Sequence, residues 1–275
     1  MYISLDPIQM LLAAASGALV GFSLGLIGGG GSILAIPLLL YVVGLAYEAP
    51  PHSELQSYLD HVVIGTTALS VGLNAYLNAF MHFRRGNVNG KEGIAFSLPG
   101  AAGAIIGSYI GHLVGGGLLL FTFGFVMIGV AMAMLRTENI GSAGGVIPVH
   151  RLIRVIPAGL TVGILSGVFG IGGGFLIVPA LVYSAGLTMV NAVGTSLIVV
   201  GTFGVTSAAT YAVFGEVSPV IAILFLLGGV AGGYVGTRVA SGLSNLMLKK
   251  VFAVVVIVVA IYIIYQNYYA IAPLL

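Results

Sequence analysis

The stretch Gly25-Leu-Ile-Gly28-Gly29-Gly30-Gly31-Ser32-Ile-Leu-Ala-Ile-Pro37 decides the fold of this chain, because its pattern returns at Gly167-Val-Phe-Gly170-Ile-Gly172-Gly173-Gly174-Phe-Leu-Ile-Val-Pro179. Several positions match between the two halves at a constant offset of 142 residues: Gly21, Gly25, Gly28, Gly30, Gly31, Pro37 and Tyr41 with Gly163, Gly167, Gly170, Gly172, Gly173, Pro179 and Tyr183. A glycine-rich break that recurs in corresponding positions of two halves points to the binding site of a transporter built from repeats.

The composition identifies the chain as an integral membrane protein. Hydrophobic residues make up 59 % of the 275 residues and charged residues only 6 %, whereas soluble domains are roughly 25 % charged. No polar stretch is long enough to form a soluble catalytic domain, so the function must lie in a single membrane domain, residues 1–275. The net charge of +2 gives no argument for nucleic acid as a partner, and cysteine is absent, which excludes thiolate metal sites.

Five apolar segments are expected in each half, which makes the fold all-α. In the first repeat, residues 1–136, they cover 8–27, 32–47, 61–83, 93–114 and 118–135. After a loop at 137–154, the second repeat, residues 155–275, places them at 155–169, 175–187, 190–214, 217–243 and 246–265. A polar insertion at 48–60 shortens the offset to 129, at which Gly65-Thr66-Thr67 matches Gly194-Thr195-Ser196. The duplication therefore covers most of the chain.

The basic residues predict how the chain crosses the membrane. The loops that hold them are assigned to the cytoplasm by the positive-inside rule. Because each half contains an odd number of segments, the second half must enter the membrane from the opposite face, so the repeats are inverted. The turn after the third segment supports this, since it is basic at Arg84 and Arg85 but acidic at Glu216 in the second half. Both termini are then expected to be extracellular.

The second segment of each half is short for a membrane span. The 16 residues from 32 to 47 would reach only about 24 Å, less than the roughly 30 Å of the hydrocarbon core. Two arrangements stay open: a broken, re-entrant helical hairpin with the preceding segment that meets the other half at the glycine-rich break, or two tilted spans.

The glycine-rich breaks are the predicted binding site. Each precedes a helix, expected to begin at Ser32 and at Gly174 or Phe175, and backbone N–H groups at a helix N-terminus bind anions without a formal cation. Inverted symmetry would bring the two breaks together near the midplane. The alternative is that the glycines only permit close helix packing. The expected substrate-binding residues in the breaks are Gly28, Gly29, Gly30, Gly31, Ser32, Gly170, Gly172, Gly173 and Gly174.

A second matched pair of motifs adds hydroxyl groups to this site. Thr66 and Thr67, with Thr195 and Ser196, could donate hydrogen bonds to the oxygens of an anion, although hydrogen bonds to their own helix backbone explain them equally well. Polar residues further along the same helices could line a path, although interhelical hydrogen bonds are the simpler interpretation. These residues are Asn74, Asn78, Thr206 and Ser207.

A basic cluster is predicted at the cytoplasmic side. His82, Arg84 and Arg85 stand together, and Arg238 lies near the same end of its segment. They would form a vestibule that concentrates anions. The alternatives are a topology signal without further function and, for Arg238, snorkelling to the interface.

The acidic residues favour an anion over a cation as the ligand. All of them fall at segment ends or in loops, so we expect no buried carboxylate for a proton relay or a cation site. The run Gly21-Phe-Ser23-Leu-Gly25 fits a hydrolase motif, but an apolar helix lacks the strand-turn-helix context, and no histidine at a suitable depth can activate Ser23. An intramembrane hydrolase is the weaker alternative, and no catalytic residue, metal or cofactor is expected.

The duplicated glycine motif, each copy followed by Pro37 or Pro179, together with Gly65-Thr66 and Gly194-Thr195, resembles the TauE/SafE sulfite exporter family of prokaryotic membrane permeases. The resemblance covers essentially the full length. It implies a multi-pass protein of the plasma membrane that exports sulfite or a small organosulfonate such as sulfoacetate, with other small anions such as thiosulfate, sulfate or a carboxylate as alternatives. The first half departs at Gly29, which corresponds to Ile171, and at Ser32, which corresponds to Gly174. The oligomeric state is not predicted.

Overall fold

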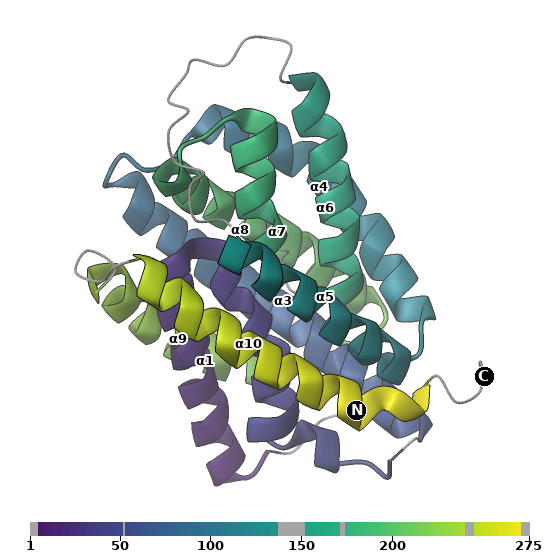
Figure 1. Ribbon diagram of the computed structural model, residues 1–275. Coiled ribbons are helices and arrows are strands. Elements are labelled where there is room, and N and C mark those ends of the chain that lie inside the picture. The colour runs from purple at the N-terminus through teal and green to yellow at the C-terminus, as the bar shows by residue number, and fades with distance from the viewer. Residues whose placement is uncertain (1–4, 52, 137–151, 171–173, 240–244, 271–275) are drawn as a thin grey trace.

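The computed structural model describes residues 5–51, 53–136, 152–170, 174–239 and 245–270, and no strand occurs among them (Figure 1). The elements are helices throughout, as the composition predicts. In chain order they are α1 (Pro7–Ile27), η1 (Gly28–Leu34), α2 (Ala35–Pro37), η2 (Leu38–Val42), η3 (Leu45–Tyr47), α3 (Glu54–Phe83), α4 (Gly90–Leu113), α5 (Gly116–Arg136), α6 (Leu152–Phe169), α7 (Gly174–Ala180), η5 (Leu181–Ala185), α8 (Met189–Val213), α9 (Pro219–Val239) and α10 (Asn245–Asn267).

Two helix pairs pack in the same way, and each pair contains one helix from the first half and one from the second. Helix α1 lies along α9, where a side chain on Gly21 would overlap the backbone of Gly229. Helix α6 lies along α4, where a side chain on Gly163 would overlap the backbone of Gly100. Small residues let two membrane helices approach at backbone distance. Gly21 and Gly163 are related by the offset of 142, and Gly100 and Gly229 by the offset of 129, so the sequence repeat reappears in the contacts.

Helices α3 and α8 run antiparallel through the centre of the molecule. Their backbones approach at Gly72 and Gly204, and the hydroxyl oxygens of Tyr76 and Thr202 lie 3.0 Å apart. The last helices of the halves, α5 and α10, also pack on each other and cross the other helices side by side (Figure 1).

The polar insertion of the first half is partly helical, which corrects the predicted boundary of the third segment. Helix α3 begins at Glu54 and not at residue 61, because Ser53 caps it: the Ser53 hydroxyl oxygen accepts a hydrogen bond of 3.1 Å from the backbone N–H of Gln56. The predicted loop between the repeats, residues 137–154, lies outside the described residues up to residue 151, and α6 begins at Leu152.

Five of the described helices are long and apolar enough to cross a membrane: Pro7–Leu26, Glu54–Phe83, Gly90–Leu113, Val190–Val213 and Pro219–Val239. Further apolar helices are shorter, and the second segment of each half is among them. In the second half it runs from Gly174 to Ala185, first as an α-helix and then as a π-helix. Such a segment reaches roughly 18 Å and is too short to cross the hydrocarbon core as a regular helix. Whether it is re-entrant stays a prediction.

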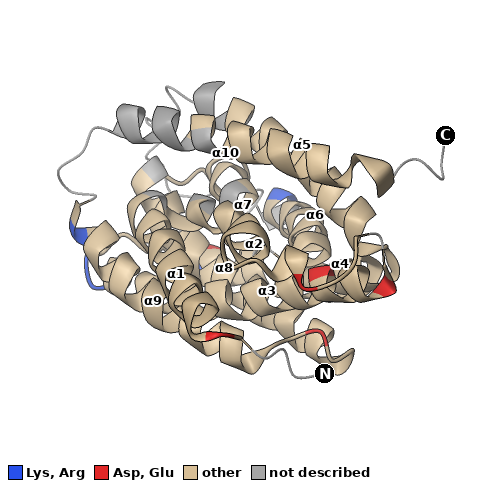
Figure 2. Cartoon of the chain, turned by 90° about the horizontal axis from the view of Figure 1, so that it is seen from below, with Lys and Arg blue, Asp and Glu red and all other residues tan. Residues whose placement is uncertain are grey.

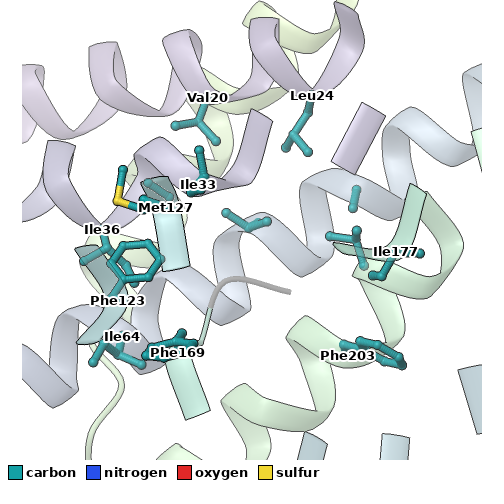
Figure 3. Close-up of a cluster of buried hydrophobic side chains, with 14 of the residues drawn as sticks. Val20, Leu24, Ile33, Ile36, Ile64, Phe123, Met127, Phe169, Ile177 and Phe203 are labelled. Carbon is teal, nitrogen blue, oxygen red and sulfur yellow. The ribbon is translucent and has the colours of Figure 1, made fainter. Parts of the chain in front are cut away.

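The buried core surrounds the segments that follow the two breaks (Figure 3). Ile33 and Ile36 of the first half and Ile177 of the second are at most 1 % exposed. Aromatic rings close the core nearby, and the ring centroids of Phe123 in α5 and Phe169 in α6 lie 5.6 Å apart. The short segments are therefore held by apolar packing on several sides.

Candidate functional site

The two glycine-rich breaks contact each other inside the protein. A Cβ added to Gly29 would lie 2.5 Å from the Cα of Gly174, and one added to Gly174 would overlap the carbonyl of Gly29. No side chain fits between two backbones at this distance. Glycine at both positions is therefore a requirement of the contact.

The first break is a tight helical turn and not an extended loop. Gly28 ends α1 with φ 73° and ψ −148°, a conformation that favours glycine, and its N–H donates to the carbonyl of Leu24. The 3₁₀-helix η1 then begins at Gly28 itself and includes Gly30, Gly31 and Ser32. The hydroxyl of Ser32 donates to the carbonyl of Gly29 over 2.9 Å. The helix after the first break thus starts earlier than the predicted Ser32.

The second break matches its predicted geometry more closely. Gly170 has φ 60°, and α7 begins at Gly174, one of the two predicted positions. Gly170 packs against Ile64 of α3, while Gly28 packs against Val193 of α8. Gly28 and Gly170 correspond in the repeat, as do Ile64 and Val193. The predicted residues Gly172 and Gly173 lie outside the described residues.

The predicted hydroxyl groups hold main-chain atoms in the described structure. Thr67 and Ser196 donate to the carbonyls of Ile64 and Val193 in their own helices, over 2.9 and 2.7 Å. This is the alternative that the sequence left open for them. Thr66 has a role that neither interpretation contained, because its Oγ1 accepts a hydrogen bond of 2.9 Å from the backbone N–H of Ser218, directly before α9.

Thr195 makes the equivalent hydrogen bond from the third segment of the second half. Its Oγ1 accepts a hydrogen bond of 2.9 Å from the backbone N–H of Asn89, directly before α4. Both threonines are fully buried. Each of them joins the third segment of one repeat to the start of the fourth segment of the other.

The predicted vestibule residues gather at one end of α3 and α9. The Arg85 guanidinium donates to the carbonyl of Thr237 over 2.9 Å, and His82 is buried beside the backbone of Gly25. Arg84 lies over the ring of Phe80, and Arg238 lies 4.3 Å from the ring centroid of Tyr234. In Figure 2 a basic group at the left edge lies apart from the acidic positions. That these residues form a vestibule and that they lie on the cytoplasmic side both stay predictions.

Two carboxylates are buried, contrary to the expectation from the sequence. Asp60 is 1 % exposed and Glu216 is 4 % exposed. Glu216 Oε1 lies 2.8 Å from Nδ1 of His112, whose ring stacks on Phe214 with centroids 3.7 Å apart. Asp60 accepts a hydrogen bond of 3.0 Å from the side chain of Gln56. Asp60 lies inside α3, which begins earlier than predicted, and Glu216 packs against His112 of α4 and against Gly65 of α3.

Asp60 also lines a cavity of about 320 Å³ between η2, α3, α5 and α10. Tyr41, Gln56 and Asn267 are among the other lining residues, and the Asn267 side chain lies 3.4 Å from the Tyr41 hydroxyl. None of the described residues predicted to bind the substrate lines this cavity. It is therefore separate from the contact between the two breaks.

Comparison with known proteins gives one family and a consistent set of relatives. A family model described as sulfite exporter TauE/SafE matches residues 13–263. A probable membrane transporter protein of Xylella fastidiosa strain Temecula1 is 41 % identical over 268 residues, which cover 94 % of this chain and 97 % of the relative. The probable membrane transporter protein YdhB of Bacillus subtilis strain 168 is 27 % identical over 235 residues, covering 84 % and 91 % of the two chains. No solved structure matches.

Proposed function

The chain belongs to the TauE/SafE sulfite exporter family, and from this membership we propose that it exports a small sulfur-containing oxyanion across the plasma membrane of a prokaryote. Sulfite or an organosulfonate such as sulfoacetate is the proposed substrate. The family and the relatives are membrane transporters, so the chain is a membrane transporter and not an enzyme. The motif around Ser23 is consistent with this, because its hydroxyl donates to the carbonyl of Leu19 within α1.

The contact between Gly29 and Gly174 is the observation that carries the proposed site. It places the starts of η1 and α7 next to each other inside the protein, where the partial positive charges of two helix N-termini add. The proposed anion lies against the backbone amides of the two breaks. Thr66 and Thr195 support the site, because a hydroxyl oxygen that accepts a main-chain N–H keeps its own proton for donation.

The membrane potential supports export as the direction of transport. An interior-negative potential contributes about 2.3 kcal/mol per elementary charge for each 100 mV to the exit of an anion. Export therefore requires no coupling ion. Inverted repeats would expose the site to the two faces of the membrane in turn.

Sulfite flux is the direct test of the proposal. The purified protein is reconstituted in vesicles with labelled sulfite, and we expect saturable flux that sulfoacetate inhibits. No saturable flux above that of empty vesicles would contradict sulfite as the substrate. Thiosulfate, sulfate and a small carboxylate are tested in the same assay, because backbone amides alone do not discriminate between small oxyanions. A member of this panel that is transported better than sulfite would replace it as the substrate.

A further inference from the structure

Helix α3 carries a polar face that the second half does not repeat. Five buried polar side chains follow one another at a spacing of four residues, so each is the neighbour of the next in a row that turns by about 40° per step around the helix. None of them is more than 8 % exposed. We call them the α3 polar face: Thr66, Ser70, Asn74, Asn78 and His82. The corresponding positions of α8 are Thr195, Val199, Phe203, Ser207 and Tyr211.

The polar face contains hydrogen-bonding atoms without partners among the described residues. Asn78 Nδ2 donates to the side-chain oxygen and the carbonyl of Asn74, over 3.1 and 2.9 Å. This leaves Asn74 Nδ2 and Asn78 Oδ1 unpaired, although both atoms are buried. The two ring nitrogens of His82 also make no hydrogen bond of ordinary geometry. Buried polar groups are almost always hydrogen-bonded, so an unpaired series calls for an explanation.

Packing alone does not explain the two asparagines. Asn74 lies against Gly229 and Asn78 against Gly233, two glycines one helical turn apart on α9. Neither amide hydrogen-bonds α9 in the described structure, so the interhelical hydrogen bond expected from the sequence is not found. Apolar side chains of the same size would fill this space without leaving unpaired atoms.

The polar face connects the parts of the proposed transport route. At one end Thr66 holds the start of α9, and at the other end His82 lies beside Gly25, which leads into the first glycine-rich break. His82 is also close to Arg85, which belongs to the basic cluster. An anion that passes between the basic cluster and the interior would follow this face of α3.

We propose that the α3 polar face is the surface that selects the transported anion, an inference that rests on the proposed export function. Asn74 Nδ2 donates to a bare oxygen of the anion, and Asn78 Oδ1 accepts from an oxygen that carries a proton. The ligand class is therefore a small oxyanion in its singly protonated form, of which hydrogensulfite is the example. His82 offers a donor and an acceptor at the entrance. The anion takes this place when α3 and α9 separate.

The corresponding positions of α8 are mostly filled by aromatic side chains and leave fewer polar atoms unpaired. The Phe203 ring fills the place next to Gly100 and stacks on Phe96, and the Tyr211 hydroxyl donates to the carbonyl of Val168 over 3.1 Å. Only Ser207 keeps an unpaired buried atom there. The second half therefore provides matched control positions for the first.

The test compares Asn74→Leu and Asn78→Leu with Ser207→Ala in reconstituted vesicles. We expect kcat/KM for sulfite at pH 6 to fall at least tenfold in each leucine variant, while the melting temperature in detergent is unchanged or rises. Ser207→Ala should stay within twofold of the wild type. Asn78→Ser, which introduces the residue type found at the corresponding position Ser207, should keep part of the activity, because a hydroxyl oxygen can also accept a hydrogen bond from the protonated anion.

The outcomes separate this inference from the proposed function. If the wild type transports sulfite and both leucine variants transport it equally well, the α3 polar face does not select the anion, and the export function stands. If the leucine variants lose activity only in proportion to a lower melting temperature, the amides are structural and the inference is wrong. If the wild type transports no anion of the panel, the proposed function itself fails.

Discussion

Helices α3 and α8 occupy corresponding places in the two halves, yet they bury different side chains. They share a set of backbone contacts, which we call the frame. Thr66 and Thr195 each accept a hydrogen bond of 2.9 Å from a backbone N–H, and Ile64 and Val193 pack on corresponding glycines. What differs is the set of buried side chains one to four turns further along, which we call the filling: α3 buries two asparagines and a histidine, whereas α8 buries the aromatic rings of Phe203 and Tyr211. The frame is common to both halves, whereas only α3 buries the amide and imidazole groups on which the proposed anion-selecting surface depends.

The turns that follow these helices show the same division. Gly86 and Gly215 have φ of 74° and 75°, so the two turns have the same backbone requirement. The residue before the glycine is Arg85 in the first half and Phe214 in the second. Arg85 reaches the carbonyl of Thr237, whereas Phe214 stacks on His112. The common backbone thus presents a positive charge at one end and an aromatic ring at the other.

Breaking the frame at its centre should have the largest effect. Gly29→Val places a branched side chain against the backbone of Gly174, and we expect a loss of at least about 3 kcal/mol in stability because two backbones cannot move apart as a side chain can. Size-exclusion chromatography of the solubilised protein and sulfite flux measure the result. Gly129→Ala is the control, since no atom lies within 4 Å of a Cβ at that position. A well-folded, active Gly29→Val variant would contradict the contact between the breaks.

Truncating the buried Phe203 of α8 should reduce the stability of the protein nearly as much. Phe203 is fully buried on Gly100, so Phe203→Ala should lower the free energy of unfolding by about 3–5 kcal/mol. The corresponding change Asn74→Ala should cost only about 1 kcal/mol, since it removes one acceptor of a shared hydrogen bond. Thermal unfolding followed by circular dichroism compares the two. Equal costs would show that the α3 polar face is packed as a structural core.

Replacing either of the two corresponding threonines, Thr66 or Thr195, should lower the stability by the same amount. Thr66→Val and Thr195→Val each leave one backbone N–H, that of Ser218 or Asn89, without its acceptor, and each should cost about 1–2 kcal/mol. Thr→Ser at either position keeps the acceptor and should restore most of the stability. Thermal unfolding provides the measurement. If only one of the two valine variants loses stability, the two threonine hydrogen bonds do not contribute equally to the stability of the protein.

The glycine positions at which backbones approach each other were visible in the sequence, whereas many contacts of the buried polar side chains could not be predicted from it. The matched glycines led to the prediction of a duplicated chain, and several of them, such as Gly21 on Gly229, lie where two helix backbones approach each other. The partner of Thr66 could not be predicted, because a hydroxyl in an apolar helix has a local acceptor as an equally good choice. The burial of Glu216 depends on a contact with His112 more than a hundred residues away.

The α3 polar face lies between these two cases. Its spacing of four residues is visible in the sequence from Thr66 to His82, and this signal could have identified it as one continuous row of neighbouring polar residues along the helix. Its unpaired atoms could not be identified, because they depend on which groups α9 presents. Glycines at Gly229 and Gly233 present none, and the sequence does not reveal that these two glycines face the asparagines.

The smallest expected effect concerns the charge difference between the two turns. Arg85 is exposed, so the attraction that we propose for it would act on an anion through solvent and not by a buried contact. Arg85→Gln should therefore raise KM for sulfite about two- to fivefold with little change in kcat, and the difference should shrink as ionic strength increases and the Debye length falls below about 10 Å. Lys91→Gln, which removes an exposed positive charge in the first turn of α4, is the control and should alter KM less. A fall in kcat that persists at high salt would instead assign Arg85 a direct role in the transport step, through its hydrogen bond to Thr237. In that case the basic cluster would belong to the moving part of the first half, and the difference between the two turns would concern mechanism more than attraction of the anion.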